Sequence, residues 1–125
     1  MTAQAVIVLA HGSRNFRANQ AFLEMVEDAG RKSGMMNIFG AFFSLADPGL
    51  EDVVHSLCRE GIEKISVFPY FLLDGSHVEK DIPERVRVMG EKFPQVRFDI
   101  LNSLEHEPLM RSIVAERARE ACGGD

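Results

Sequence analysis

Short runs of apolar residues alternate along the whole chain with segments whose apolar residues recur every three or four positions. Each run is bounded by turn residues, which is typical of strands buried in a parallel sheet. The segments between the runs have the spacing of helices that bury one face. The predicted strands cover about residues 4–10, 38–45, 64–71 and 96–101.

Local signals place the ends of the predicted helices. The first is expected over 16–32, with Gly34 as its terminator. The second is expected to open at Asp47-Pro48, with Asp47 near the N-cap, and to end before Gly61. The third is expected to begin near Asp81-Ile82-Pro83, and the last follows Pro108. The apolar residues at helical spacing are Phe22, Met25, Val26 and Ala29, then Leu50, Val53, Val54, Leu57 and Cys58, then Ile82, Val86, Met89 and Phe93, and finally Leu109, Met110, Ile113, Val114 and Ala118.

The strict alternation of strand and helix predicts an α/β fold. A parallel sheet with right-handed crossovers carries helices on both faces, so we expect a three-layer α/β/α architecture with a four-stranded parallel sheet. The chain of 125 residues is long enough for one core and too short for two. Residues 1–125 are therefore expected to form a single domain.

Composition and charge exclude several classes of function. The net charge of −5 argues against a general nucleic-acid binder, which needs a basic face for phosphates. The N-terminal apolar run is too short to cross a bilayer, and no basic residue precedes it as in a signal peptide. Cys58 and Cys122 have no disulfide or metal-site spacing. We therefore expect a cytoplasmic protein without a membrane partner.

Two of the four histidines lie in Gly/Ser loops that directly follow predicted strands. His11 begins His-Gly-Ser-Arg, and His77 ends Asp-Gly-Ser-His. Because the carboxyl ends of parallel strands meet at one edge, where ligands bind, both side chains are expected at that edge. Imidazole pairs bind divalent metals and transfer protons near neutral pH. His55 is expected on a solvated helix face, and His106 is a weaker candidate between two glutamates.

The sequence around these histidines resembles a known family. The quoted motifs are His-Gly-Ser-Arg at 11–14, Asp-Pro-Gly-Leu at 47–50, and Pro-Tyr-Phe-Leu-Leu-Asp-Gly-Ser-His at 69–77 followed by Asp-Ile-Pro at 81–83. Together they resemble the class II tetrapyrrole chelatases, and specifically the short sirohydrochlorin cobaltochelatases of the CbiX family. The likeness covers nearly the whole chain, and the long second motif is the specific part.

The resemblance implies a chelatase-like, flavodoxin-like domain that corresponds to one half of a two-lobed chelatase. It implies that this domain works as a homodimer. It implies a lyase that inserts a divalent metal into sirohydrochlorin without ATP, in tetrapyrrole or cobalamin biosynthesis. The metal is then a substrate (cobalt first, with nickel or iron as alternatives), and no cofactor is permanently bound. His11 and His77, matched to the family's histidines, would bind the metal and take a proton. The residues expected to bind or support the substrate are Gly12, Ser13, Arg14, Gly75 and Ser76, with Asp81 and Glu79 further out.

Several alternatives stay open at this point. Ser13 is equally consistent with an N-cap, and Asp81 with the start of a helix. Many family members have a glutamate where this chain has Ser44. A non-catalytic metal or tetrapyrrole carrier would use the same histidines. A histidine phosphatase is disfavoured, since its signature needs an arginine where Ala10 stands.

Overall fold

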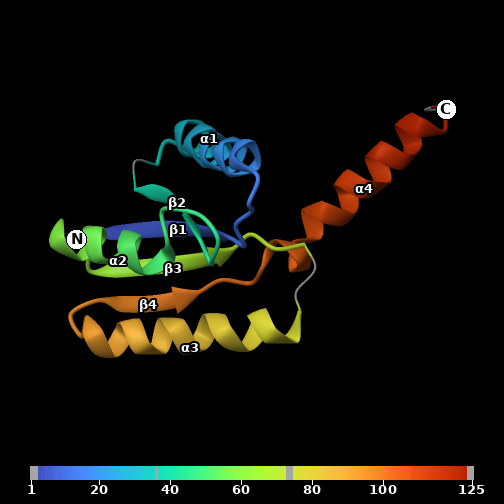
Figure 1. Ribbon diagram of the computed structural model, residues 1–125. Coiled ribbons are helices and arrows are strands. Elements are labelled where there is room, and N and C mark those ends of the chain that lie inside the picture. Colours follow the sequence, from blue (N-terminus) through green and yellow to red (C-terminus); the bar gives the residue numbers. More distant parts are fainter. Residues whose placement is uncertain (1–2, 36, 73–74, 124–125) are drawn as a thin grey trace.

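The computed structural model describes residues 3–35, 37–72 and 75–123, with the side chains of 76–79 left out. Its sheet is four-stranded and parallel, in the order β2-β1-β3-β4 (Figure 1). The strands are β1 (Gln4–Ala10), β2 (Ile38–Phe42), β3 (Lys64–Pro69) and β4 (Arg97–Ile100). The helices are α1 (Phe16–Ser33), α2 (Leu50–Arg59), α3 (Ser76–Lys92) and α4 (Pro108–Ala121), with a short 3-10 turn η1 (Leu104–His106). The predicted α/β class and parallel sheet are confirmed.

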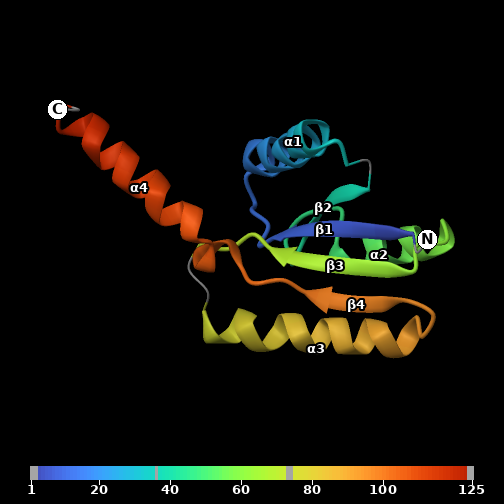
Figure 2. The same cartoon turned by 180° about the vertical axis from the view of Figure 1, so that it is seen from behind.

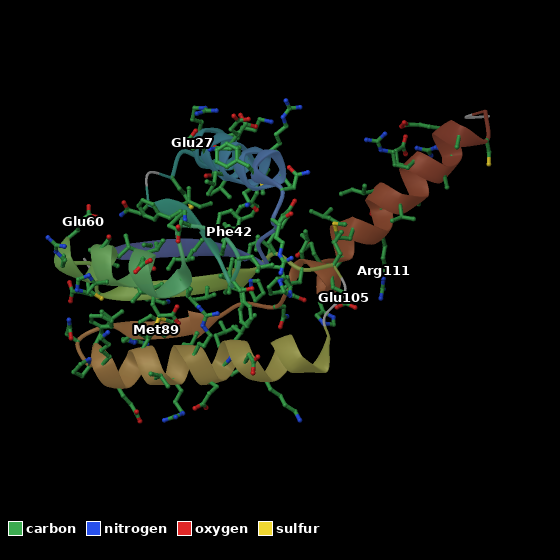
Figure 3. The ribbon with its side chains drawn as sticks, in the orientation of Figure 1. Glu27, Phe42, Glu60, Met89, Glu105 and Arg111 are labelled. Atoms are coloured by element: carbon green, nitrogen blue, oxygen red, sulfur yellow. The ribbon has the colours of Figure 1, made fainter. Side chains whose placement is uncertain are left out.

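The helices cover the sheet unequally. On one face, which we call the core face, α2 and α3 pack over β1 and β3 and form the main hydrophobic core (Figure 2). Ile7 and Ile65 point to this face and are fully buried, as is Val54 of α2. Met89 points from α3 toward the strands, as Figure 3 shows. The opposite face, which we call the α1 face, is covered by α1 over β2.

The predicted helical stripes are buried on the core face. Leu50, Val54 and Leu57 of α2 are buried, as expected from their spacing. On α3, Ile82, Val86 and Met89 are buried at the same spacing. The stripe of α1 is only half-buried apart from Val26. This helix lies so close to β2 that a Cβ on Gly40 would come within 2.8 Å of the Leu23 side chain.

The predicted boundaries around β2 and α2 are wrong. The strand ends at Phe42 rather than at residue 45, because Leu45 turns the chain with a φ of 69°. Asp47 is not the N-cap of α2, since the N-cap is Gly49. The Pro48 carbonyl instead accepts a hydrogen bond from the Phe42 N–H at 2.9 Å. Residues 47 and 48 thus belong to the loop that follows the sheet edge.

The predicted start of α3 is also wrong, by five residues. The helix begins at Ser76, so Pro83 lies inside it rather than in its first turn. Proline inside a helix removes one main-chain hydrogen bond, and its ring needs room. Pro83 is exposed, so the ring lies on the solvent side of α3. The helix therefore continues through a residue that more often marks a helix start.

The final helix begins at Pro108, close to where it was predicted, but it does not cover the sheet. No residue of α4 is buried. Figures 1 and 2 show it projecting away from the rest of the chain, beyond the carboxyl ends of the strands. Among the described helices, α1 is thus the one that covers the α1 face, over β2. Over the described residues, no helix combines the length and the hydrophobicity needed to cross a membrane.

Candidate functional site

The loops that follow the strands are tied together at the carboxyl edge of the sheet. The Phe43 N–H donates to the Ala10 carbonyl at 2.7 Å, which joins the loop after β2 to the end of β1. The Tyr70 N–H donates to the Leu9 carbonyl at 2.7 Å. The turn η1, after β4, is held by a bond from the Glu105 N–H to the Phe71 carbonyl at 3.0 Å. All four loops thus meet at one edge, as the parallel topology requires.

His11 lies at this edge between two aromatic rings. Its ring centroid is 5.8 Å from that of Phe43 and 5.8 Å from that of Phe71, the latter edge-on at 72°. Its carbonyl accepts the Ser44 N–H at 3.0 Å, so Ser44 stands directly beside it. The residue is exposed. His11 is therefore a sterically held imidazole that a ligand from solvent can reach.

Gly12 allows the loop after β1 to lie against the loop after β2. Its φ is +99°, a conformation that L side chains rarely adopt. A Cβ at this position would come within 1.8 Å of the Ser44 carbonyl oxygen. Both the conformation and the contact require glycine. Gly12 thus fixes the backbone that carries His11, and its contact with substrate stays a prediction.

Ser13 is not the N-cap of α1. The cap is Asn15, whose side-chain oxygen accepts the N–H groups of Arg17 and Ala18. The Ser13 hydroxyl accepts the Asn15 N–H at 3.0 Å. Its own N–H and carbonyl are both bound by the Asn19 side-chain amide, at 3.0 and 2.7 Å. Because that N–H already has an acceptor, the hydroxyl is the group through which Ser13 could bind a ligand, and its contact with substrate stays a prediction.

The second histidine lies at the start of α3. His77 is the second residue of the helix, directly after Ser76, and Gly75 is its N-cap. The side chains of Ser76, His77 and Glu79 lie outside the described residues. Asp81 is half-buried, one helical turn after His77. The loop before α3 starts from the same sheet edge as His11, and the approach of the two imidazoles stays a prediction.

The remaining two histidines, His55 and His106, are also exposed. His55 is on α2, with its ring centroid 6.0 Å from that of Phe93, as expected of a surface residue. His106 is the last residue of η1. Within the described ranges, no group of three or more histidine, cysteine or acidic residues is placed to hold a metal. A metal bound at His11 would need ligands from another source, such as His77 or the substrate.

Arg85 of α3 holds the aromatic wall beside His11, and sequence reasoning missed it. Its guanidinium lies 4.5 Å from the centroid of the Phe43 ring and donates to the Phe43 carbonyl at 2.6 Å. It also makes a two-bond pair with Glu51 of α2. The hydrogen bond from Arg85 lowers the pKa of Glu51 below the usual value of a glutamate. These partners are 34 and 42 residues apart in sequence, so no local motif announces the contact.

The Glu51–Arg85 pair is expected to make stability depend on pH in the acid range. A carboxyl with a lowered folded pKa stabilises the fold above its unfolded pKa, and the contribution is lost as pH falls through the folded value. Since Glu51 is 52% exposed, Glu51→Gln should cost less than about 1 kcal/mol near pH 7. Denaturant unfolding at pH 7 and below about pH 4 should show this difference shrinking toward zero. Glu27→Gln, on the exposed side of α1, is the control, and an equal loss at both pH values would contradict the assignment.

A hollow beside the His11 loop is lined by apolar groups and by charges of both signs, with Asp47 as well as Arg14 among them. It has a volume of about 310 Å³ and lies between the start of α1 and the loop after β2. Its lining includes Arg14, Phe16 and Leu45. Phe16 is 70% and Leu45 60% exposed, which is unusual for side chains so apolar. Among the described residues no ion pair involves Arg14, so its charge is available to a ligand.

Comparison with known proteins identifies the family. The CbiX family model matches residues 5–121. The chain belongs to the CbiX family. This CbiX chain is 28% identical over 115 residues to the chloroplastic sirohydrochlorin ferrochelatase of Arabidopsis thaliana, covering 92% of the chain and 51% of that protein. It is 30% identical over 87 residues to the sirohydrochlorin cobaltochelatase of Methanopyrus kandleri, covering 70% of the chain and 61% of that protein.

Solved structures agree on the fold. A CbiX protein from Marinobacter aquaeolei VT8 superposes with a TM-score of 0.84 at 24% identity, over 98% of this CbiX chain and 99% of that one. The sirohydrochlorin chelatase SirB of Bacillus subtilis subspecies spizizenii, in complex with cobalt, gives 0.83 at 24% identity, over 95% of this chain and 51% of that one. The chain thus spans about half the length of several relatives that it matches.

Proposed function

We propose that this chain is a class II chelatase that inserts a divalent metal into sirohydrochlorin or a closely related tetrapyrrole without ATP. The observation that carries the proposal is His11, exposed between Phe43 and Phe71 where all four strand-end loops meet. Family membership supports the reaction class, since relatives are named sirohydrochlorin cobaltochelatase and ferrochelatase. Cobalt is the first expectation, and nickel and iron(II) also accept imidazole ligands.

The chemistry suits imidazole side chains. Insertion replaces two pyrrole N–H protons by bonds to the metal, so the site must deliver an ion and accept protons. A neutral imidazole does the first and an unligated imidazole the second. We propose that His11 and His77 share these tasks from the loop after β1 and the start of α3. The rings of Phe43 and Phe71, each 5.8 Å from the His11 ring between centroids, would limit how that imidazole turns.

The substrate would bind over the same edge. Sirohydrochlorin presents a flat conjugated ring and a rim of carboxylates. The hollow at Arg14, Phe16 and Leu45 offers a cation for a carboxylate and apolar surface for the ring. We propose the Ser13 hydroxyl as a further donor.

On α3, the proposed substrate contacts are Gly75 and Ser76. Asp81, one turn after His77, would orient that imidazole, and Glu79 would assist more remotely. The chain is proposed to be a single chelatase-like domain, acting as a cytoplasmic homodimer with no nucleic-acid or membrane partner and no permanently bound cofactor. A second copy would supply the length that the longer relatives carry in one chain.

An anaerobic insertion assay tests the proposed function. Sirohydrochlorin absorbance is followed with cobalt(II), nickel(II) or iron(II) in turn, each against the spontaneous rate without protein. We expect many turnovers per chain with at least one metal, and cobalt fastest. A carrier would instead bind metal or macrocycle in a fixed ratio and leave the insertion rate at the spontaneous value. That outcome would contradict the enzyme hypothesis and support the alternative, a non-catalytic carrier.

A further inference from the structure

The two edge strands of the described sheet differ in how they are protected. β2 and β4 lie at the two edges, so each has one side without a neighbouring strand in that sheet. β4 carries Arg97 and Asp99, and charged residues on an edge discourage pairing with another chain. β2 reads Ile-Phe-Gly-Ala-Phe and has neither a charge nor a proline. The edge of β2 is therefore the better suited of the two to accept a further strand.

Some main-chain groups of β2 point outward along this edge. The Phe43 N–H, just after the strand, donates to the Ala10 carbonyl of β1, so every second residue counted back from Phe43 also faces β1. Because neighbouring residues of a strand direct their main-chain groups to opposite sides, Ile38 and Gly40 face the open edge. No group among the described residues is bonded to the outward N–H and C=O groups of these two. An added strand would find both donors and acceptors there.

A groove runs along the open edge, between α1 and α2. It has a volume of about 560 Å³, and its lining includes the apolar side chains of Val26, Phe39 and Val53. A second hollow, of about 310 Å³, shares Glu27 and Ile38 with the first and continues toward the end of α1. We call the larger hollow the edge groove. Because the two hollows together follow the strand, they suit an extended chain better than a compact ligand.

Carboxylates on both helices border the edge groove. Glu27 of α1, Asp52 of α2 and Glu60 at the end of α2 line it, and all three are exposed. Figure 3 shows Glu27 and Glu60 on the two helices that contact β2. Among the described residues, these carboxylates have no ion pair and form no group that is placed to hold a metal. The edge groove is therefore acidic, and no basic residue in the described part of the chain lines it.

We propose that the edge groove binds an extended segment of a partner protein, rich in lysine or arginine and in apolar residues. The segment would pair with the outward groups of Ile38 and Gly40 as a further strand. Lysine and arginine have apolar stems and charged heads, which fits walls that are apolar inside and acidic at the rim. β2 extends about 17 Å, so five or six residues would cover it. A second copy of this acidic chain is disfavoured as the occupant, because it would bring like charges together.

The bound segment would lie beside the proposed insertion site and leave that site open. Pro48 lines the edge groove, and its carbonyl accepts the Phe42 N–H at 2.9 Å. The next residue, Phe43, has its ring beside that of His11. The groove thus reaches the loop after β2 from the side, where a partner would be held next to the proposed site. The inference goes beyond metal insertion and does not depend on it.

The first test is an NMR titration of the isotope-labelled chain with the synthetic peptide acetyl-Lys-Val-Lys-Val-Lys-Val-Lys-amide, without metal or macrocycle. We expect saturable shifts of the Ile38 and Gly40 amide signals. Two control peptides should bind about tenfold more weakly or worse. One has glutamate in place of each lysine, which removes the charge match, and the other is methylated on every main-chain nitrogen, which removes the donors for strand pairing. The absence of shifts in β2, or a control peptide that binds as well as the first, would overturn the proposal.

The second test reverses charges on the rim of the groove. Asp52→Lys/Glu60→Lys should weaken binding of the lysine peptide by about tenfold or more, with the fold checked by circular dichroism. The matched control Asp99→Lys/Glu120→Lys makes the same change in net charge at exposed positions on β4 and α4 and should bind like the wild type. Equal weakening in the control would show attraction to the overall charge. Amide shifts in β2 that follow the protein concentration instead of the peptide would assign the groove to a second copy. Either result would overturn the proposal.

Discussion

Replacing His11 by alanine is expected to slow metal insertion by about tenfold or more. His11 is exposed at the meeting point of the strand-end loops, and its ring packs against Phe43 and Phe71. Its loss removes both a metal ligand and a proton acceptor from the proposed site. His77→Ala is expected to have an effect of the same size, because the two imidazoles are proposed to act together.

The measurement is the initial insertion rate at saturating metal, with circular dichroism to show that the fold persists. His55→Ala is the matched control, since that histidine is exposed on α2, with its ring near Phe93. It should insert metal at the wild-type rate. Wild-type rates in both His11→Ala and His77→Ala would refute the assignment of the site.

Replacing Gly12 by alanine is expected to cost about 2–4 kcal/mol of stability. The added Cβ would lie 1.8 Å from the Ser44 carbonyl oxygen, which is backbone and cannot rotate away. The loop after β2 must move, and with it the wall formed by Phe43. We therefore expect both a lower free energy of unfolding and a lower insertion rate in the folded fraction.

The control for Gly12 is Gly34→Ala. Gly34, which ends α1, has a φ of +74°, but no atom lies within 4 Å of the position that an added Cβ would take. Its substitution therefore tests the backbone conformation without the clash. It should cost about 1 kcal/mol and leave insertion unchanged. Chemical denaturation of both variants gives the comparison, and equal losses at the two glycines would show that the contact with Ser44 is unimportant.

The pattern of apolar residues predicted the sheet and its helices. An element that buries its side chains must place apolar residues at positions set by its own geometry, which leaves a recognisable pattern in the sequence. Ile7 and Ile65 lie in uninterrupted apolar runs, and the stripe of Leu50, Val54 and Leu57 recurs at helical spacing. The topology then placed His11 at the carboxyl edge without any structural information. This part of the site follows from the order of strands and helices alone.

Element boundaries depended on weaker local signals. Asp47-Pro48 and Asp81-Ile82-Pro83 both have the composition of a helix start, but one lies in a loop and the other inside α3. Proline and aspartate occur in loops as well as at helix starts, so the surrounding contacts decide where the helix begins. The Pro48 carbonyl is held by the Phe42 N–H, a contact that no pattern within the loop encodes.

Two features of the molecule depend on contacts that local patterns in the sequence do not encode. Arg85 is an ordinary charged residue of α3 until folding brings it to Phe43 and Glu51. The stripe of α4 predicts an apolar contact, but periodicity does not say which surface provides it. Ile113 and Val114 are exposed, so none of the described residues covers them.

The central claim is that His11 and His77 bind one metal ion together, and cobalt K-edge X-ray absorption tests it most directly. The protein is loaded with cobalt(II) and compared with His11→Ala and His77→Ala under the same conditions. The account predicts imidazole scattering in the wild type that decreases in each variant. Cobalt scattering that is the same in all three proteins would contradict it.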